Sequence, residues 1–207
     1  MKFFAPVFSV LCAALALAAG PAAAQSNMII TGVFDGPLSG GTPKMVEVYV
    51  VNNISDLSIY GLGSANNGGG SDGEEFSFPD AVPASTGTYL YVASESSQFT
   101  TYFGFAPDYV SSMASINGDD AVELFMNGGV EDVFGEIDTD GSGEAWEYMD
   151  GWANRNAGTG PDGTTFVLGN WTYSGPNAVD GCATNAGCSS VYPLASYPVE
   201  LMSFNVE

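Results

Sequence analysis

Hydrophobic and polar residues alternate with a period of two along much of the chain. In residues 44–51 (KMVEVYVV), three valines fall on one face, while Met45, Glu47 and Tyr49 fall on the other. Residues 120–126 (DAVELFM) alternate in the same way. This period is typical of half-buried β-strands, so we expect both segments to form central strands.

Further short alternating or apolar runs are separated by turn residues, and each of them predicts another strand. Seven short strands in one chain favour an all-β fold, namely a β-sandwich. Besides the two central segments, the runs are 28–34, 57–62, 74–78, 88–93 and 130–134.

One segment follows a helical period instead. Phe99, Tyr102 and Phe103 recur at spacings of three and four, after the serine-rich segment 94–97. We expect one short helix here, with the aromatic stripe packed into the core at one end of the sandwich. Long glycine-rich loops are expected at 61–73 and 135–143, because glycine permits turns that other residues resist.

The first 24 residues have the pattern of a signal peptide. Lys2 precedes an uncharged apolar run over residues 7–19, and Ala22–Ala24 supply the small residues of a cleavage site. The alternative, a membrane anchor, needs a span of about 20 apolar residues, which is longer than this run. We therefore predict an exported protein, secreted or at the cell surface, whose mature form has no membrane span.

The expected domains are a signal peptide (1–24), a β-sandwich (25–172) and a Pro/Gly/Ser-rich tail (173–207). The tail ends in a strand-like segment and contains Cys182 and Cys188, the only cysteines left after processing. In an oxidising compartment these two are expected to form a disulfide, with free thiols as the alternative. We expect the tail to lie outside the core.

Charge narrows the range of partners. Two basic residues, Lys44 and Arg155, remain after processing against 24 acidic ones, which gives a net charge of −22. Nucleic-acid affinity comes mainly from Lys and Arg, so direct binding of nucleic acid is disfavoured. The partners expected instead are a cell-surface polymer or an envelope or secreted protein.

The chain contains no histidine, so Ser-His-Asp and Cys-His nucleophile arrangements cannot be built from it. A two-carboxylate glycosidase remains open in principle, because four acids lie close to two tryptophans in the sequence: Glu136, Glu144, Glu147 and Asp150 near Trp146 and Trp152. Such enzymes use deep clefts on larger scaffolds. We therefore predict a protein that is not an enzyme.

The order of the motifs resembles the lamin-tail domain, an immunoglobulin-like sandwich found in nuclear lamins and in secreted bacterial proteins. The resemblance covers about residues 28–156. It is carried by MIITGVFDG, VEVYVVNNISDLSIYGL, FSFP, TYLYVAS and INGDDAVELFMNGGVEDVFGEI. It implies the sandwich fold and a binding or anchoring role, and it implies no reaction.

Two functions follow. The first is a secreted, non-catalytic module for binding or tethering. The alternative is an accessory subunit or detached module of a secreted hydrolase such as a nuclease or phosphatase, beside which bacterial members of this family occur. No catalytic domain accompanies the module here, and the basic residues that a nuclear lamin tail offers to chromatin are missing.

A calcium site is the main candidate for metal binding. Asp138, Asp140, Ser142 and Glu144 place oxygen side chains at alternate positions around glycines, like the first half of an EF-hand loop. Met149 stands where the bidentate Glu of that loop would be, so any site needs ligands from elsewhere. The alternative is a solvated acidic turn.

Residues 146–156 (WEYMDGWANRN) hold a second candidate surface. Trp146 and Trp152 would act as stacking platforms for a carbohydrate or partner, beside Arg155. The alternative is a closing strand or loop with a structural ion pair and aromatic packing.

Overall fold

The first alternating segments form a long antiparallel pair, β1 (Met28–Leu38) and β2 (Thr42–Val50). The protein is described here from a computed structural model that covers Met1 and residues 26–197. The predicted signal peptide, with its cleavage site after Ala24, lies outside the described residues, and so does the end of the chain from residue 198. The alternation is confirmed, because Val46 and Val48 face the core between the sheets and Met45 faces the other way.

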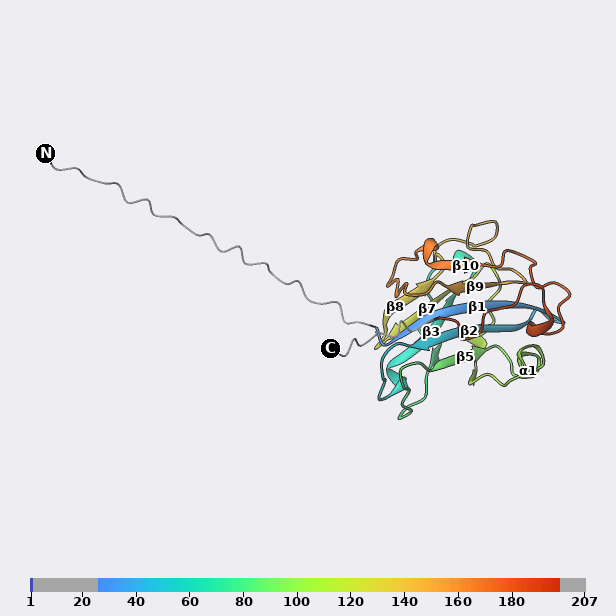
Figure 1. Ribbon diagram of the computed structural model, residues 1–207, viewed down its shortest axis with the longest axis horizontal. Helices are drawn as coiled ribbons and strands as arrows, with labels where there is room; N and C mark the ends of the chain where they lie inside the picture. Colours follow the sequence, from blue (N-terminus) through green and yellow to red (C-terminus); the bar gives the residue numbers. More distant parts are fainter. Residues whose placement is uncertain (2–25, 198–207) are drawn as a thin grey trace.

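The described chain is a two-layer, all-β sandwich with one α-helix (Figure 1). One sheet has six strands in the order β10-β9-β1-β2-β5-β6, and the other has four in the order β4-β3-β7-β8. The remaining strands are β3 (Tyr60–Ala65), β4 (Phe76–Ser77), β5 (Tyr89–Ala93), β6 (Tyr109–Val110), β7 (Ala121–Met126), β8 (Gly129–Phe134), β9 (Trp152–Arg155) and β10 (Trp171–Tyr173).

Five short 3-10 turns connect these strands. They are η1 (Leu57–Ile59), η2 (Asn66–Gly68), η3 (Ser112–Ala114), η4 (Leu168–Asn170) and η5 (Asn185–Gly187). The strand expected over 57–62 is thus split: its first half is η1 and its second half begins β3. The strand expected over 74–78 is reduced to the two residues of β4.

The main core lies between the two sheets. Val33, Val46 and Val92 of the six-stranded sheet pack with Leu62 and Leu124 of the four-stranded sheet, and all five are buried. Burial of such side chains supplies most of the favourable free energy of folding.

A second core covers the outer face of the six-stranded sheet. The predicted helix is α1 (Ser97–Phe103), and its buried Phe99 and Tyr102 pack over Phe34 and Met45. The prediction that the aromatic stripe packs in a core is confirmed. The helix packs against the outer face of the six-stranded sheet where β1 ends and β2 begins, and Figure 1 shows it at one end of the molecule.

The expectation of a peripheral tail is also wrong for residues 174–197. Val179, Cys188 and Tyr192 are buried in the second core beside α1. Composition suggested exposure, because this segment is rich in Pro, Gly and Ser, but a few apolar side chains are enough to anchor it. Cys182 and Cys188 form the predicted disulfide.

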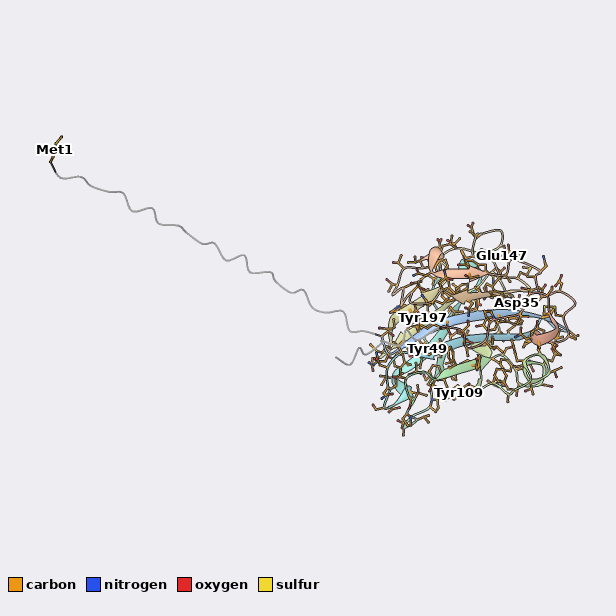
Figure 2. The ribbon with its side chains drawn as sticks, viewed as in Figure 1. Met1, Asp35, Tyr49, Tyr109, Glu147 and Tyr197 are labelled. Atoms are coloured by element: carbon orange, nitrogen blue, oxygen red, sulfur yellow. A yellow bond between two sulfur atoms is a disulfide. The ribbon has the colours of Figure 1, made fainter. Side chains whose placement is uncertain are left out.

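The last described residues cross the six-stranded sheet as a strap, residues 192–197. Figure 2 shows Tyr197 beside Tyr49 of β2, and their ring centroids are 5.4 Å apart. The Tyr89 hydroxyl donates to the carbonyl of Tyr197 at 2.5 Å. No helix in the described part of the chain is long and apolar enough to span a membrane.

Candidate functional site

A pocket of about 250 Å³ opens beside β8, where the loop after that strand meets the loop before β10. Its apolar part comes from Val133, Ile137 and Phe166. Carboxylates and hydroxyls surround that part, and they belong to Glu136, Asp138, Thr139, Thr164 and Thr165.

Both walls of this pocket are held by packing behind them. The Phe166 ring lies 5.6 Å from the buried Phe134 ring and 6.3 Å from that of Trp146, centroid to centroid. On the other wall, the Gly70 amide donates to the carbonyl of Ile137 at 2.9 Å. The polar groups are therefore presented by loops that are tied to the sandwich.

Exposed apolar side chains follow the pocket-lining segment in sequence. Val167 and Leu168 follow Phe166 directly, and both side chains are exposed. Glu136 also accepts a hydrogen bond from the Thr139 hydroxyl at 3.2 Å. The pocket thus offers hydrogen-bond acceptors and hydroxyls over an aromatic and aliphatic floor, which suits a ligand rich in hydroxyl groups or one that carries positive charge.

The four residues predicted to bind calcium lie in the turn after β8, and all are exposed. Asp140 accepts a hydrogen bond from the Ser142 amide at 2.9 Å, and this bond lowers the pKa of Asp140. Asp138 lines the pocket, whereas Glu144 does not. Within residues 26–197, no three His, Cys, Asp or Glu side chains are grouped closely enough to hold a metal ion.

The second predicted surface is corrected by burial. Trp146 is 3 % exposed, so it cannot serve as a stacking platform, and Arg155 is 1 % exposed, so it is not part of a binding surface. Trp152 is half-buried, and its indole donates to Ser190 Oγ at 3.1 Å. The three residues do not converge on one surface, and the alternative of ion pairing and aromatic packing describes their contacts.

Arg155 joins the two sheets through a buried ion pair. Its Nη2 lies 2.8 Å from each carboxylate oxygen of Asp132 on β8, and its Nη1 lies 3.2 Å from Asp162. The Ile30 carbonyl accepts from Arg155 Nε, and the Ile30 amide donates to Asp132. The pair therefore satisfies main-chain groups of β1 at the register shift between Ile30 and Gly32.

A third polar group, which sequence reasoning did not single out as a site, is Glu47 on the outer face of β2. The strap covers it completely, and it accepts hydrogen bonds from Thr31 Oγ1 at 2.7 Å and from the Ala195 amide at 3.1 Å. Burial raises the pKa of Glu47, and these hydrogen bonds together with the Tyr91 and Tyr192 hydroxyls oppose the rise. The site is sealed, so we regard it as structural.

A second groove, of about 310 Å³, lies between α1 and the disulfide loop. Its lining contains fewer charged groups than that of the pocket beside β8. The side-chain amide of Asn185 is already hydrogen-bonded to the main-chain N–H and carbonyl of Tyr192. The pocket beside β8 is therefore the better candidate for ligand binding.

Comparisons with known proteins do not assign the chain to a family. No family model, curated protein or solved structure matches it.

Sequence reasoning found part of this site and missed the rest. It singled out Asp138 as an oxygen ligand, and it expected any local function to lie in the two glycine-rich loops 61–73 and 135–143, of which only the second lines the pocket. It missed Thr164, Thr165 and Phe166, because only the fold brings them beside a loop about 30 residues earlier in the chain.

Proposed function

We propose that the mature chain is a secreted, non-catalytic binding module of the lamin-tail type of immunoglobulin-like sandwich, and that it binds a polymer at the cell surface. The observation that carries this proposal is the pocket beside β8. Carboxylates and threonine hydroxyls stand there around an apolar floor, on loops fixed to the sandwich.

The arrangement of strands supports the family part of the proposal. The motifs that resemble the lamin-tail domain fall on β1, β2, β3, β4, β5, β7 and β8, which make up most of both layers. The absence of histidine from the sequence supports a role in binding rather than hydrolysis.

The chemistry of the pocket favours polysaccharides without negative charge. Carboxylates such as Glu136 and Asp138 accept hydrogen bonds from sugar hydroxyls, and the Phe166 ring offers an apolar face for a sugar ring. The net charge of −22 for the mature chain repels phosphorylated and sulfated polymers. A neutral or amino-sugar polymer is therefore the expected ligand.

The test is binding of the mature protein to a panel of immobilised polysaccharides that are neutral, cationic or anionic. We expect retention on neutral or cationic members. The double variant Glu136→Gln, Asp138→Asn should weaken that binding at least tenfold, because two lost charge-assisted hydrogen bonds are worth more than about 1.4 kcal/mol.

The matched control is Asp80→Asn, Asp180→Asn, which removes the same charge from exposed positions outside the pocket. It should bind like the wild type. Equal weakening by both variants would mean that bulk charge, not the pocket, governs binding. Retention on no polysaccharide, with capture of a secreted hydrolase from the native envelope, would instead favour the role of an accessory subunit.

A further inference from the structure

Three loops meet at one end of the sandwich, and acidic side chains gather where they touch. The turn 117–120 before β7 is bonded to the loop after β8, because the Gly141 amide donates to the carbonyl of Asp119 at 3.0 Å. The loop after β3 joins them, because the Asn67 amide donates to Asp120 at 2.9 Å.

Asp119 is the unusual member of this group. Its side chain faces the loop after β8, since its Oδ2 accepts a hydrogen bond from Ser142 Oγ at 2.9 Å. The residue is only 8 % exposed, and its other oxygen, Oδ1, is buried without a hydrogen-bond partner in the described structure. A buried carboxylate oxygen with no partner is costly, so it calls for a compensating group.

Asp140 is a second carboxylate that is hydrogen-bonded to Ser142. Asp140 Oδ1 accepts from the Ser142 main-chain amide at 2.9 Å, while the remainder of this side chain is exposed. Ser142 is thus bonded to both carboxylates, which brings oxygen atoms of Asp119, Asp140 and Ser142 into one neighbourhood. The nearby Lys44 does not neutralise them, because it is paired with Asp35 and Asn117.

We propose that Asp119, Asp140 and Ser142 form a calcium site, in which the unpartnered Oδ1 of Asp119 is a ligand. Calcium accepts flexible sets of six to eight oxygens, including hydroxyl, main-chain and water oxygens, so two carboxylates can suffice. With so few charged ligands the affinity falls in the weak range typical of extracellular modules, for which Kd is about 0.1–1 mM.

This assignment changes the ligand set expected from sequence. Asp119 is added to the ligand set, because the fold places it against Ser142 although 23 residues separate them. Asp138 is left out of the set because it lines the pocket beside Gly70. Glu144 is left out because, among the described residues, only its main-chain groups form hydrogen bonds. The inference goes beyond the proposed function, since it requires no polymer to be bound.

The first test compares the melting of the mature protein in millimolar calcium, in magnesium and in sodium chloride at matched ionic strength. A ligand that binds only the folded state stabilises it, so calcium should raise Tm by about 2–4 °C beyond sodium. Magnesium should do less, because it demands near-ideal octahedral geometry. Asp119→Asn and Asp140→Asn should each lose the calcium-specific rise.

The matched control is Asp138→Asn, Glu144→Gln, which removes two exposed acids from the same loop and should keep the rise. A wild type that gains no more from calcium than from sodium would overturn the proposal. So would an Asp119→Asn variant that gains as much as the wild type, or a control that loses the gain. Asp140 is exposed, so Asp140→Asn should fold even where Asp119→Asn fails to.

A second readout reports the position of the ion. A Cβ placed on Gly141, between Asp140 and Ser142, would lie 2.6 Å from the Trp146 ring, so this ring is directly beside the site. Terbium, used as the probe, should therefore emit on excitation of tryptophan, and calcium should displace it. Trp146→Phe should lose the emission and keep the calcium-dependent rise in Tm. Unchanged emission in Trp146→Phe or in Asp140→Asn would place the ion elsewhere.

Discussion

Glu47 shows how one residue links the fold to pH. It is a carboxylate buried on the face of β2, with no salt-bridge partner among the described residues. Its neighbours are the Thr31 hydroxyl of β1, the Tyr91 hydroxyl of β5, and the Ala195 amide and Tyr192 hydroxyl of the strap. A charge in such a place is disfavoured by desolvation, so the protonated form is favoured in the folded protein.

The sign of the pH dependence follows. Because the pKa of Glu47 in the fold is raised above the ordinary value of 4.5, the folded protein holds this proton more tightly than the unfolded chain. That contribution to stability is complete below about pH 4.5 and is lost as the pH rises through the folded-state pKa. We predict that Glu47→Gln is more stable than the wild type at pH 7.5 and that the difference vanishes near pH 4.

This prediction is checked by urea unfolding of both proteins at several pH values. The difference in unfolding free energy is the quantity of interest, because the other acids titrate equally in both. A variant that is less stable than the wild type at pH 7.5 would show that the ionised form of Glu47 is held favourably under the strap.

Arg155 shows where residue-level reasoning stops. The sequence identified it as the one arginine of the chain, and acidic neighbours made an ion pair a reasonable alternative to a binding role. It could not identify Asp132 as the partner, or show that Ile30 would need both side chains. Those contacts depend on a register shift in β1 that no local pattern encodes.

At the level of elements, strands with clear alternation were predictable and those with mixed polarity were not. β2 and β7 carry regular valine and leucine positions, and both were predicted within two residues of their bounds. β9 and β10 are short, and β9 includes Asn154 and Arg155, whose side chains are buried by distant partners. No hydrophobic period marks such a strand, so it appeared only as one of two alternatives.

The burial of the segment after β10 was wrongly predicted for a related reason. Its glycines, prolines and serines are typical of exposed chain, but Val179, Cys188 and Tyr192 fill the space beside α1. Gly32 makes this packing feasible, since a Cβ there would lie 1.7 Å from the Tyr192 hydroxyl. Gly32 and Tyr192 are 160 residues apart in sequence, so only the fold shows that the ring packs against this glycine.

The disulfide therefore belongs to a packed element. Linking Cys182 to Cys188 closes a loop of about seven residues, and the chain-entropy model gives about 2 kcal/mol for a loop of that length. We predict that Cys182→Ala, Cys188→Ala lowers the unfolding free energy by about that amount and raises hydrogen exchange in residues 176–197. Peptide-resolved hydrogen exchange with urea unfolding measures both.

The two halves of this prediction separate the alternatives. A loss of stability without faster exchange in the segment would mean that the bond acts mainly on the unfolded chain. Unchanged stability and unchanged exchange would contradict the placement of the loop in the second core.

At the scale of the whole molecule, the outer face of the six-stranded sheet is covered, whereas the pocket beside β8 is open. The outer face of the six-stranded sheet is covered by α1 and by the segment that ends in the strap. The pocket beside β8 lies between the loop that follows β8 of the four-stranded sheet and the loop that precedes β10 of the six-stranded sheet. A strongly acidic surface keeps such a module soluble and repels anionic polymers.

The most direct measurement is a heteronuclear NMR titration of a protein spanning residues 25–207 with oligosaccharides of the polymer that binds best in the retention test. The account predicts shifts in the amide signals of residues 133–139 and 164–166, with the signals of residues 101–104 and 184–186 unmoved. Shifts confined to the groove between α1 and the disulfide loop, or no shifts at saturating ligand, would contradict the assignment of the pocket beside β8 as the binding site.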